Sequence, residues 1–325
     1  MPAKNAAPFI SKCIESIIQQ SFENWELVIV DDFSTDLTVE IVSDFSLKDV
    51  RIRLFKNREN GIIPALQRAF EKSSGQYVTR MDADDLMPID KLDLFYNEIK
   101  KHQNSVVTGN VNYFSNDEVS EGYIRYEKWL NSLTKKDDFY NAIYRECTIA
   151  SPNWMVNRIC FVKDFKFSDL IYPEDYDMVF QWYKNNYSVV KLNQVTHFWR
   201  EHESRTSRVH EAYQQESFFK LKANYFIDIE LKVNEKVQLI GAGIKGKLVA
   251  AILKKRNVKF DWFDFKIDKQ NQHQILGQKI KSIFELNIEQ KSILTVWPKD
   301  KKTQDEILIF FEERNFIFGK NVWLF

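Results

Sequence analysis

Short apolar runs alternate with helix-period segments along residues 10–99. The run at 25–30 has the length and composition of a buried strand, whereas Ile10, Ile14 and Ile17 share one helical face. A β-α-β-α order of this kind predicts a largely parallel sheet with helices on both faces. We therefore expect an α/β fold, in which ligands bind at the carboxyl ends of the strands.

Acid residues stand at two of these expected strand ends. Asp31 and Asp32 follow one run, and Asp82-Ala-Asp-Asp85 follows the run at 76–81. If that strand continues far enough, its two-residue period points Asp82 and Asp84 to the same side. Two such carboxylates form half a site for Mg²⁺ or Mn²⁺, with water and substrate phosphates as the other ligands. A polar strand end or helix cap is the alternative, although close carboxylates repel one another unless a cation is present.

Composition excludes several classes of protein. The 325 residues are enough for two domains, and an apolar share of 44% is enough for a packed core. Lys and Arg total 46, as do Asp and Glu, which argues against a nucleic-acid partner bound through a broad basic face. The three cysteines form no CxxC pair, and reduced thiols fit a cytoplasmic protein. No run approaches the roughly 18 apolar residues of a membrane span, so we expect at most peripheral membrane contact.

A second, smaller α/β domain is expected near the carboxyl terminus. A strand at 237–240 leads into a Gly-Ala-Gly-Ile-Lys-Gly loop and a helix, as in a dinucleotide-binding fingerprint. Asp261 and Asp264 lie about 20 residues on, where a ribose-binding acid is expected. The candidate residues of this loop are Gly241, Gly243, Gly246 and Asp264.

The expected domains are 1–231 and 236–325, and the second is Rossmann-like. No hydride-transfer constellation follows Asp264. A structural or ligand-sensing role is therefore as well supported as dinucleotide binding, and NAD is an alternative cofactor that we do not expect.

Three acidic motifs resemble those of a known family in their order and spacing. They are Val30-Asp-Asp-Phe-Ser-Thr-Asp36, Gly75-Gln-Tyr-Val-Thr-Arg-Met-Asp-Ala-Asp-Asp85 and Glu174-Asp-Tyr-Asp177. Together with Pro2-Ala-Lys-Asn5 they resemble the family-2 glycosyltransferases with the GT-A fold, over roughly residues 1–208. The resemblance implies inverting, metal-dependent transfer of a sugar, from a nucleotide-sugar such as a UDP-sugar to an acceptor hydroxyl. It also implies a place in surface glycan biosynthesis.

The resemblance implies a role for each of the first two motifs. Asp32 would lie beside the nucleobase, with Asp31, Pro2 and Ala3 in the same pocket. The alternative is that residues 31–34 simply cap the helix that follows. The metal and the diphosphate would be held by Asp82 and Asp84, supported by Asp85.

Asp175 in the third motif would be the catalytic base, which takes a proton from the acceptor hydroxyl. Its neighbours Glu174 and Asp177 can instead be helix N-terminal charges that complement the helix dipole. We favour that interpretation for Asp177.

Two later segments extend the resemblance. His202 and Ser204 would contact the donor phosphates, and a surface histidine and a capping serine are equal alternatives. Asn153 and Trp154 would shape the acceptor side, and a core tryptophan is an equal alternative.

The sequence also departs from the family pattern. The family has an apolar strand before the Pro-x-x-Asn element, and we expect the domain here to lack this first strand unless translation begins upstream. Lys4 replaces a common tyrosine, and no Gln-x-x-Arg-Trp element follows Asp175, which argues against a processive synthase.

The expected partners are a nucleotide-sugar donor and a glycan or lipid-linked glycan acceptor, at the inner face of the membrane. Two competing functions stay open. One is a nucleotide-dependent oxidoreductase centred on the Gly241 loop, and the other is a non-catalytic binding protein with a degenerate transferase fold.

Overall fold

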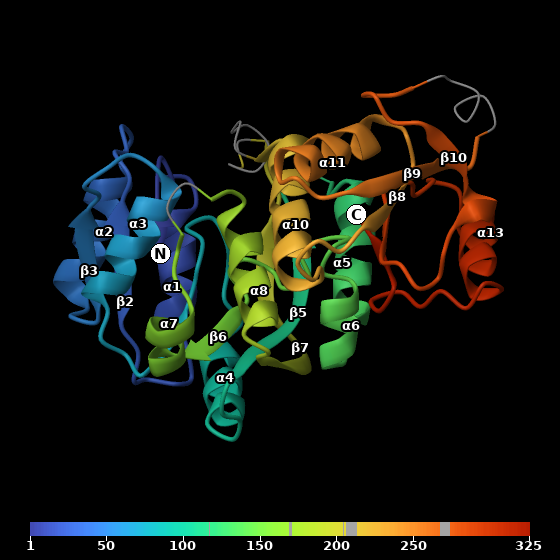
Figure 1. Ribbon diagram of the computed structural model, residues 1–325. Helices are drawn as coiled ribbons and strands as arrows, with labels where there is room; N and C mark the ends of the chain where they lie inside the picture. Colours follow the sequence, from blue (N-terminus) through green and yellow to red (C-terminus); the bar gives the residue numbers. More distant parts are fainter. Residues whose placement is uncertain (117, 169–170, 204, 206–212, 267–273) are drawn as a thin grey trace. The chain divides into compact units, whose positions relative to one another are not determined.

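The chain folds into two compact units, which are described separately. One comprises Met1–Phe139 and Thr148–Val209, and the other Tyr140–Cys147 and His210–Phe325. The structure is a computed structural model, and it describes residues 1–116, 118–168, 171–203, 205, 213–266 and 274–325 (Figure 1). The division differs from the boundary expected between residues 231 and 236, because helix α10 (Gln215–Ile229) belongs to the second unit.

The first unit contains a parallel sheet in the order β1-β2-β3. Its strands are β1 (Pro2–Ala3), β2 (Leu27–Asp31) and β3 (Ile52–Lys56). The strand β1 has two residues, and Ala3 pairs with Asp31 of β2. This short strand consists of the first two residues of the Pro-x-x-Asn element.

A second sheet of this unit has the order β4-β6-β5-β7. Its strands are β4 (Tyr77–Thr79), β5 (Ser105–Phe114), β6 (Trp154–Asn157) and β7 (Ser188–Arg200). β6 runs antiparallel to β4 and β5, whereas β5 and β7 are parallel, so the sheet is mixed.

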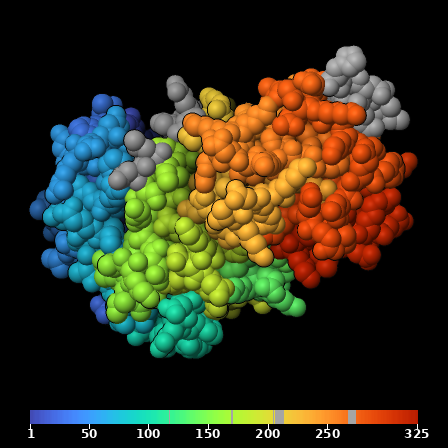
Figure 2. Space-filling model, in the orientation of Figure 1, coloured from blue at the N-terminus to red at the C-terminus, as the bar shows by residue number. Residues whose placement is uncertain are grey.

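Helices alternate with these strands as the sequence predicts. They are α1 (Ile10–Ile18), α2 (Thr38–Lys48), α3 (Ile62–Lys72), α4 (Lys91–Ile99), α5 (Glu121–Ser132), α6 (Lys136–Asn141), α7 (Arg158–Asp164) and α8 (Glu174–Lys184). Segments distant in sequence pack together, since the rings of Phe70 on α3 and Phe161 on α7 lie 4.5 Å apart. Figure 2 shows the blue and yellow-green segments that carry these helices meeting at the surface.

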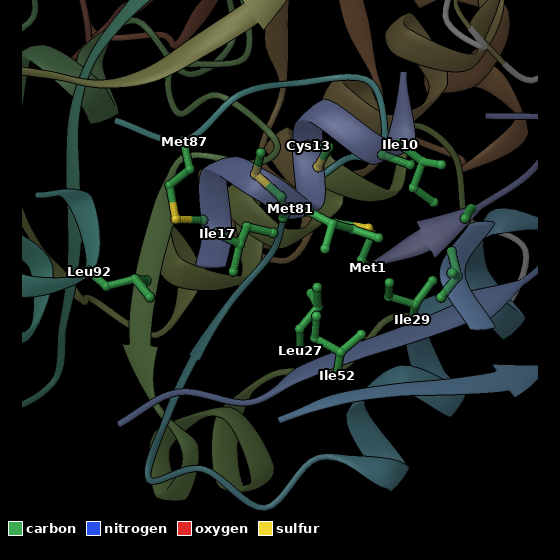
Figure 3. Close-up of a cluster of buried hydrophobic side chains, with 14 of the residues drawn as sticks. Met1, Ile10, Cys13, Ile17, Leu27, Ile29, Ile52, Met81, Met87 and Leu92 are labelled. Carbon is green, nitrogen blue, oxygen red and sulfur yellow. The ribbon is translucent and has the colours of Figure 1, made fainter. Parts of the chain in front are cut away.

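The helical face predicted for α1 is buried and forms part of one apolar cluster. Ile10, Ile14 and Ile17 are each at most 3% exposed. They pack with the inner side of β2 and with the residues that flank the acidic segment after β4, as Figure 3 shows for Leu27, Ile29, Met81 and Met87. The cluster therefore ties that acidic segment to the core of the unit.

The second unit is built on a parallel sheet in the order β10-β9-β8-β11-β12. Its strands are β8 (Val237–Ile240), β9 (Phe260–Asp264), β10 (Ile280–Ser282), β11 (Ser292–Leu294) and β12 (Val322–Leu324). Besides α10, it contains α11 (Ile244–Lys255), the short helix η2 (Ile283–Glu285) and α13 (Lys301–Glu312). This doubly wound arrangement confirms the Rossmann-like fold expected from the sequence.

Candidate active site

The acidic loop, defined here as residues 80–85, follows β4. That strand ends at Thr79, so Asp82 and Asp84 lie in a turn, and the two-residue alternation expected to align them does not extend this far. Both side chains are nonetheless partly exposed, Asp82 at 23% and Asp84 at 26%. The turn therefore presents two carboxylates to solvent.

Asp85 points into the protein interior. It is 1% exposed, and it accepts hydrogen bonds from the backbone N–H of Arg200 (2.8 Å) and from His197 Nε2 (2.9 Å). Burial raises the pKa of Asp85 well above its ordinary value, and the charges of Asp84 and Asp82 raise it further. In this geometry Asp85 anchors the acidic loop and does not face an incoming cation.

A buried lysine stands behind this anchor. Lys91 on α4 is fully buried, and its Nζ donates to the carbonyl of Pro152 (2.8 Å) and lies 3.3 Å from His197 Nδ1. Burial lowers the pKa of Lys91 to about 7 and holds the pKa of His197 well below its usual range. With Lys91 donating to Nδ1, the neutral imidazole carries its hydrogen on Nε2 and donates it to Asp85.

Asp84 meets a histidine from the segment after β7. His202 Nε2 lies 2.8 Å from Asp84 Oδ2, and the His202 side chain is 18% exposed. The Phe9 ring, 4.6 Å from the imidazole, supports it from one side. His202 is therefore at the acidic loop, whereas Ser204 lies outside the residues that the structure describes.

Asp84 and His202 offer ligands for a divalent cation at the acidic loop. Over residues 1–116, 118–168, 171–203, 205, 213–266 and 274–325, no three His, Cys, Asp or Glu side chains converge as a metal cage. Asp84 and His202 instead offer one oxygen and one nitrogen from partly exposed positions. Mn²⁺ accepts both kinds of ligand, and a cation that binds with a nucleotide takes its remaining ligands from phosphate and water. The pair fits such a cation better than a cage of protein ligands alone.

Arg80 connects the acidic loop to the start of α8. Its Nε donates to Asp82 Oδ1 (2.8 Å) and its Nη1 to Glu174 Oε1 (2.9 Å). Arg80 is 6% exposed and Glu174 is 2% exposed, so this ion pair is buried. The second and third acidic motifs are therefore linked by a single guanidinium group.

Asp175 follows Glu174 in the first turn of α8 and is partly exposed. Burial raises the pKa of Asp175 to about 7, the charge of Glu174 adds to the rise, and Arg80 opposes it. The charge of Asp82 also raises the pKa of Asp175, which places the two carboxylates within electrostatic reach of each other. A carboxylate whose pKa lies near neutral pH is suited to accept a proton.

The third acid of this motif has a structural environment. Asp177 is 1% exposed, and it accepts a hydrogen bond from Gln181 Nε2 (2.7 Å) one turn later in α8. This agrees with the helix-terminal interpretation that we favoured for Asp177 and leaves Asp175 as the accessible acid of the motif.

Asp32 stands at the carboxyl end of β2 and is held by groups from two loops. Its Oδ1 accepts from Asn57 Nδ2 (2.7 Å) and from the N–H of Gly61 (2.9 Å). Its Oδ2 lies 3.4 Å from Lys4 Nζ. Asp31 accepts from the N–H of Ser34 (3.2 Å).

The capping alternative for this segment is not what the structure shows. Helix α2 begins at Thr38, and Asp36 Oδ1 accepts the Thr38 N–H (3.0 Å). Residues 31–34 therefore form a turn that precedes the helix. Pro2 and Ala3 form β1, which pairs with Val30 and Asp31 of β2.

Tyr172 lies within electrostatic reach of both Asp32, in the turn at residues 31–34, and Glu174, at the start of α8. The charges of Glu174 and Asp32 both contribute to raising the pKa of the Tyr172 phenol, after burial. A Cβ placed on Gly61 would lie 3.7 Å from the Tyr172 hydroxyl. Asp32, Glu174 and the acidic loop thus surround one region of the first unit.

Asn153 and Trp154 are interior residues. Asn153 is fully buried, and it donates to the carbonyl of Gly109 (2.9 Å) and accepts from Thr196 Oγ1 (2.8 Å). Trp154 is 4% exposed and packs edge-on against Trp182. The structure supports the alternative of a core tryptophan over an acceptor-shaping role.

The glycine loop of the second unit, residues 241–246, is tight and is hydrogen-bonded to Trp262 and Asp264 of the neighbouring strand. Gly241 has φ +102°, and a Cβ on Gly246 would lie 1.8 Å from the Gly241 carbonyl oxygen. Gly243 precedes α11 in an ordinary backbone conformation. The close backbone approach that we expected of this loop is therefore made by Gly246 and Gly241.

Asp264 does not face outward from this loop. It is 3% exposed, and its two oxygens accept the N–H groups of Ala242 (2.6 Å) and Lys266 (2.8 Å). Asp261 is paired with Lys236 and Lys281. The acids expected to bind a ribose are engaged within the protein.

Sequence reasoning missed Arg80, Lys91, Asn57 and His197. Arg80, Asn57 and His197 contact predicted acids from segments distant in sequence, and Lys91 contacts His197, so no local pattern marks them. Arg80 had one signal, since a cation at the end of an apolar run, next to three acids, needs partners when it is buried.

Comparison with known proteins agrees with this geometry. A model of the family Glycosyl transferase family 2 matches residues 1–161. A glycosyltransferase of Haemophilus influenzae, described as uncharacterized, is 28% identical over 261 residues, which cover 73% of this chain and 77% of that protein. A second relative, from Escherichia coli, is the UDP-Glc:alpha-D-GlcNAc-diphosphoundecaprenol beta-1,3-glucosyltransferase WfgD. It is 29% identical over a region that covers 57% of this chain and 69% of the WfgD chain. The chain spans less than half of two streptococcal glycosyltransferases that it also matches.

Solved structures show the same fold. TarS 1–349 of S. aureus in complex with UDP-GlcNAc has a TM-score of 0.57 and 20% identity, covering 78% of this chain and 70% of that one. The mannosyltransferase PcManGT of Pyrobaculum calidifontis, in complex with GDP-Man and Mn²⁺, has a TM-score of 0.51 and 18% identity. The match covers 78% of this chain and 67% of PcManGT.

The fold, the three acidic motifs and these relatives define a glycosyltransferase with a GT-A fold. The matched part of the chain, residues 1–161, is a glycosyl transferase family 2 domain. Within the described part of the chain, no helix combines the length and apolar character needed to cross a bilayer.

Proposed function

We propose that the protein transfers a sugar from a UDP-sugar to an acceptor hydroxyl of a growing surface glycan, with inversion at the anomeric carbon. The observation that carries this proposal is the position of Asp175. It is partly exposed, its pKa is raised to about 7, and Arg80 and Glu174 connect its turn to the acidic loop. The proposed base and the acidic loop that would hold the cation are thus linked in one site.

Asp175 accepts the proton of the acceptor hydroxyl, and the freed oxygen attacks the anomeric carbon from the side opposite the leaving diphosphate. Asp84 and His202 would hold Mn²⁺ or Mg²⁺, with Asp82 beside them. When bound, the cation offsets the charge that grows on the departing diphosphate. A single displacement of this kind inverts the anomeric centre.

Asp32 is proposed to face the nucleobase, and Asp31, Pro2 and Ala3 to form the floor of that pocket. Lys4, Asn57 and Gly61 fix the Asp32 carboxylate in place. Its Oδ2, which lies 3.4 Å from Lys4 Nζ, is the oxygen that we propose to accept a ring N–H, which uracil carries and cytosine lacks.

The acceptor class is proposed from the relatives. WfgD is named for transfer to a lipid diphosphate-linked sugar, and TarS binds UDP-GlcNAc. We therefore propose a glycan or lipid-linked glycan acceptor, with the reaction in the cytoplasm at the inner face of the membrane.

The test is a screen of nucleotide-sugars for Mn²⁺-dependent hydrolysis by the whole chain. We expect one UDP-sugar to be turned over with Mn²⁺ or Mg²⁺, and activity to be lost in EDTA. Turnover that persists unchanged in EDTA would contradict the metal-dependent mechanism, and a preference for a non-uridine donor would correct the choice of base.

A further inference from the structure

Arg80 is the buried cation between the acidic loop and the Glu174-Asp175 turn. Its side chain is 6% exposed, and its guanidinium group extends two arms, to Asp82 Oδ1 and to Glu174 Oε1. The two contacts measure 2.8 and 2.9 Å, the usual length of charge-assisted hydrogen bonds. Two carboxylates from distant parts of the chain therefore share one planar group.

Rigidity follows from the chemistry of that group. A guanidinium group is planar and always charged, so its arms hold their partners at a fixed separation and angle. Glu174 is 2% exposed, and a buried carboxylate without a cation is strongly unfavourable. Neither the acidic loop nor the first turn of α8 can shift without breaking one of these bonds.

Each partner of Arg80 is adjacent to a residue with a proposed chemical role. Asp82 lies in the acidic loop two residues before Asp84, and Glu174 directly precedes Asp175. Asp82 belongs to the donor side of the site and Glu174 to the base side. A displacement of either segment would change the distance between the base and the leaving group, and such misplacement costs rate steeply.

We propose that Arg80 is a positioning residue that fixes the acidic loop and the Asp175 turn relative to each other. The inference rests on the proposed function and adds to it a residue that neither the acidic motifs nor the relatives assign. Arg80 contacts neither reactant in this role and acts through Asp82 and Glu174.

The electrostatic surroundings support the same role. Burial and the charge of Glu174 raise the pKa of Asp175, and the positive charge of Arg80 opposes that rise. Because Arg80 also neutralises Glu174, it limits the repulsion between two adjacent carboxylates. Positioning and charge compensation therefore come from one side chain.

The test compares Arg80→Lys, Arg80→Met and Glu174→Gln with the wild type, using the UDP-sugar that the wild type hydrolyses fastest. Lysine keeps the charge but is a point donor, so it cannot reproduce both arms in one geometry. We expect kcat to fall about tenfold in Arg80→Lys and about 100-fold in Arg80→Met. The donor KM should rise in both, because Asp82 is released.

Glu174→Gln separates the two arms. It leaves the Asp82 contact in place, so kcat should fall while the donor KM and the Mn²⁺-dependent affinity for UDP stay near wild type. A purely structural role for Arg80 would not produce this split between kcat and KM.

Arg158 offers a matched control in the same unit. Its guanidinium group also makes two contacts, to the Gly75 carbonyl and to Ser73 Oγ, and neither is to an acid of the site. Arg158→Met should lower thermal stability while the kcat and KM of the folded protein remain unchanged. Folded fractions are measured by circular dichroism before each assay.

The outcomes are distinguishable. If wild-type protein shows neither Mn²⁺-dependent UDP binding nor turnover, both the proposed function and the role of Arg80 fail. If the wild type binds and turns over the donor but folded Arg80→Met has the same kcat and KM, the role of Arg80 alone is overturned. The same holds if Arg158→Met impairs catalysis as strongly as Arg80→Met.

Discussion

The acidic loop at 80–85 and the glycine loop at 241–246 occupy comparable places, since each follows a strand and carries or contacts an acid. They use their polar groups in opposite ways. Asp82 and Asp84 are partly exposed at the surface of a loop anchored from below by Asp85. The acid at the glycine loop, Asp264, is buried, and both of its oxygens accept hydrogen bonds from backbone N–H groups.

The difference shows how a binding loop is told from a structural one. A ligand needs polar groups that are accessible and whose partners can be exchanged. The acidic loop has such groups because a second layer of buried residues holds it in place. The acid beside the glycine loop is held by backbone N–H groups, and the close approach of Gly246 to Gly241 gives this loop a packing role in its unit.

The largest expected effect concerns Asp175. Asp175→Asn is nearly isosteric, so the fold should survive while the base is lost. We expect the transfer rate to fall about 10²–10⁴-fold with little change in UDP-sugar affinity. This equals roughly 3–5 kcal/mol of barrier, at about 1.36 kcal/mol per factor of ten.

Asp177→Asn is the matched control, because Asp177 is buried on the same helix and Asn retains an acceptor for Gln181. It should leave the rate near wild type. Transfer by Asp175→Asn at a rate similar to that of the control would remove Asp175 from the mechanism.

The second prediction tests the structural role of the glycine loop. Gly246→Val places a side chain against the Gly241 carbonyl, where a Cβ would lie 1.8 Å from the oxygen. Overpacking of this kind costs about 1–3 kcal/mol or more, so we expect a clear loss of stability in denaturant unfolding.

Gly277→Asn is the comparison within the same unit. Gly277 has φ +70°, which Asn tolerates, and no atom lies within 4 Å of its added Cβ. Its unfolding midpoint should stay near wild type. Equal midpoints for Gly246→Val and wild type would show that the loop is not tightly packed.

The third prediction is that the transfer rate falls about tenfold for each pH unit below about 7. Asp175 must be ionised to act, and its pKa is raised to about 7. The rate should therefore rise with pH to a plateau above about 7, and fall to roughly a tenth one unit below. A profile that is flat between pH 5 and 8 would exclude this base.

Stability should respond to the same group in the opposite sense. The folded-state pKa of Asp175, about 7, exceeds its ordinary value of 3.8, so the folded state binds the proton more tightly. The stabilisation from protonated Asp175 is present below pH 4 and is lost as the pH rises through 7. Asp175→Asn should remove this component from the measured stability curve.

Several features of the fold follow directly from the sequence. The buried face of α1 is visible in the spacing of Ile10, Ile14 and Ile17, because apolar periodicity reports burial. The Rossmann-like second unit is visible in its strand-loop-helix pattern. The short length of β4 is not visible, since the apolar run at 76–81 continues past Thr79 into residues buried outside any strand.

The sequence predicts the acidic residues of the candidate site but not the residues that hold them in place. Asp84 and Asp175 stand in motifs, and motifs are local. Arg80 bonds to Glu174 beside Asp175, and Lys91 supports the His197–Asp85 pair beside Asp84, through contacts that form only when distant segments meet. The orientation of Asp85 and Asp264 toward the interior likewise depends on which backbone N–H groups the fold brings near them.

The most direct measurement is a calorimetric titration of UDP and NAD, with and without Mn²⁺, into wild type and Asp84→Ala. We predict that UDP binds the wild type only when Mn²⁺ is present, that Asp84→Ala loses this binding, and that NAD does not bind. UDP affinity that is equal in EDTA, in Mn²⁺ and in Asp84→Ala would contradict the central claim. So would NAD binding that exceeds UDP binding, because the site would then lie at the glycine loop.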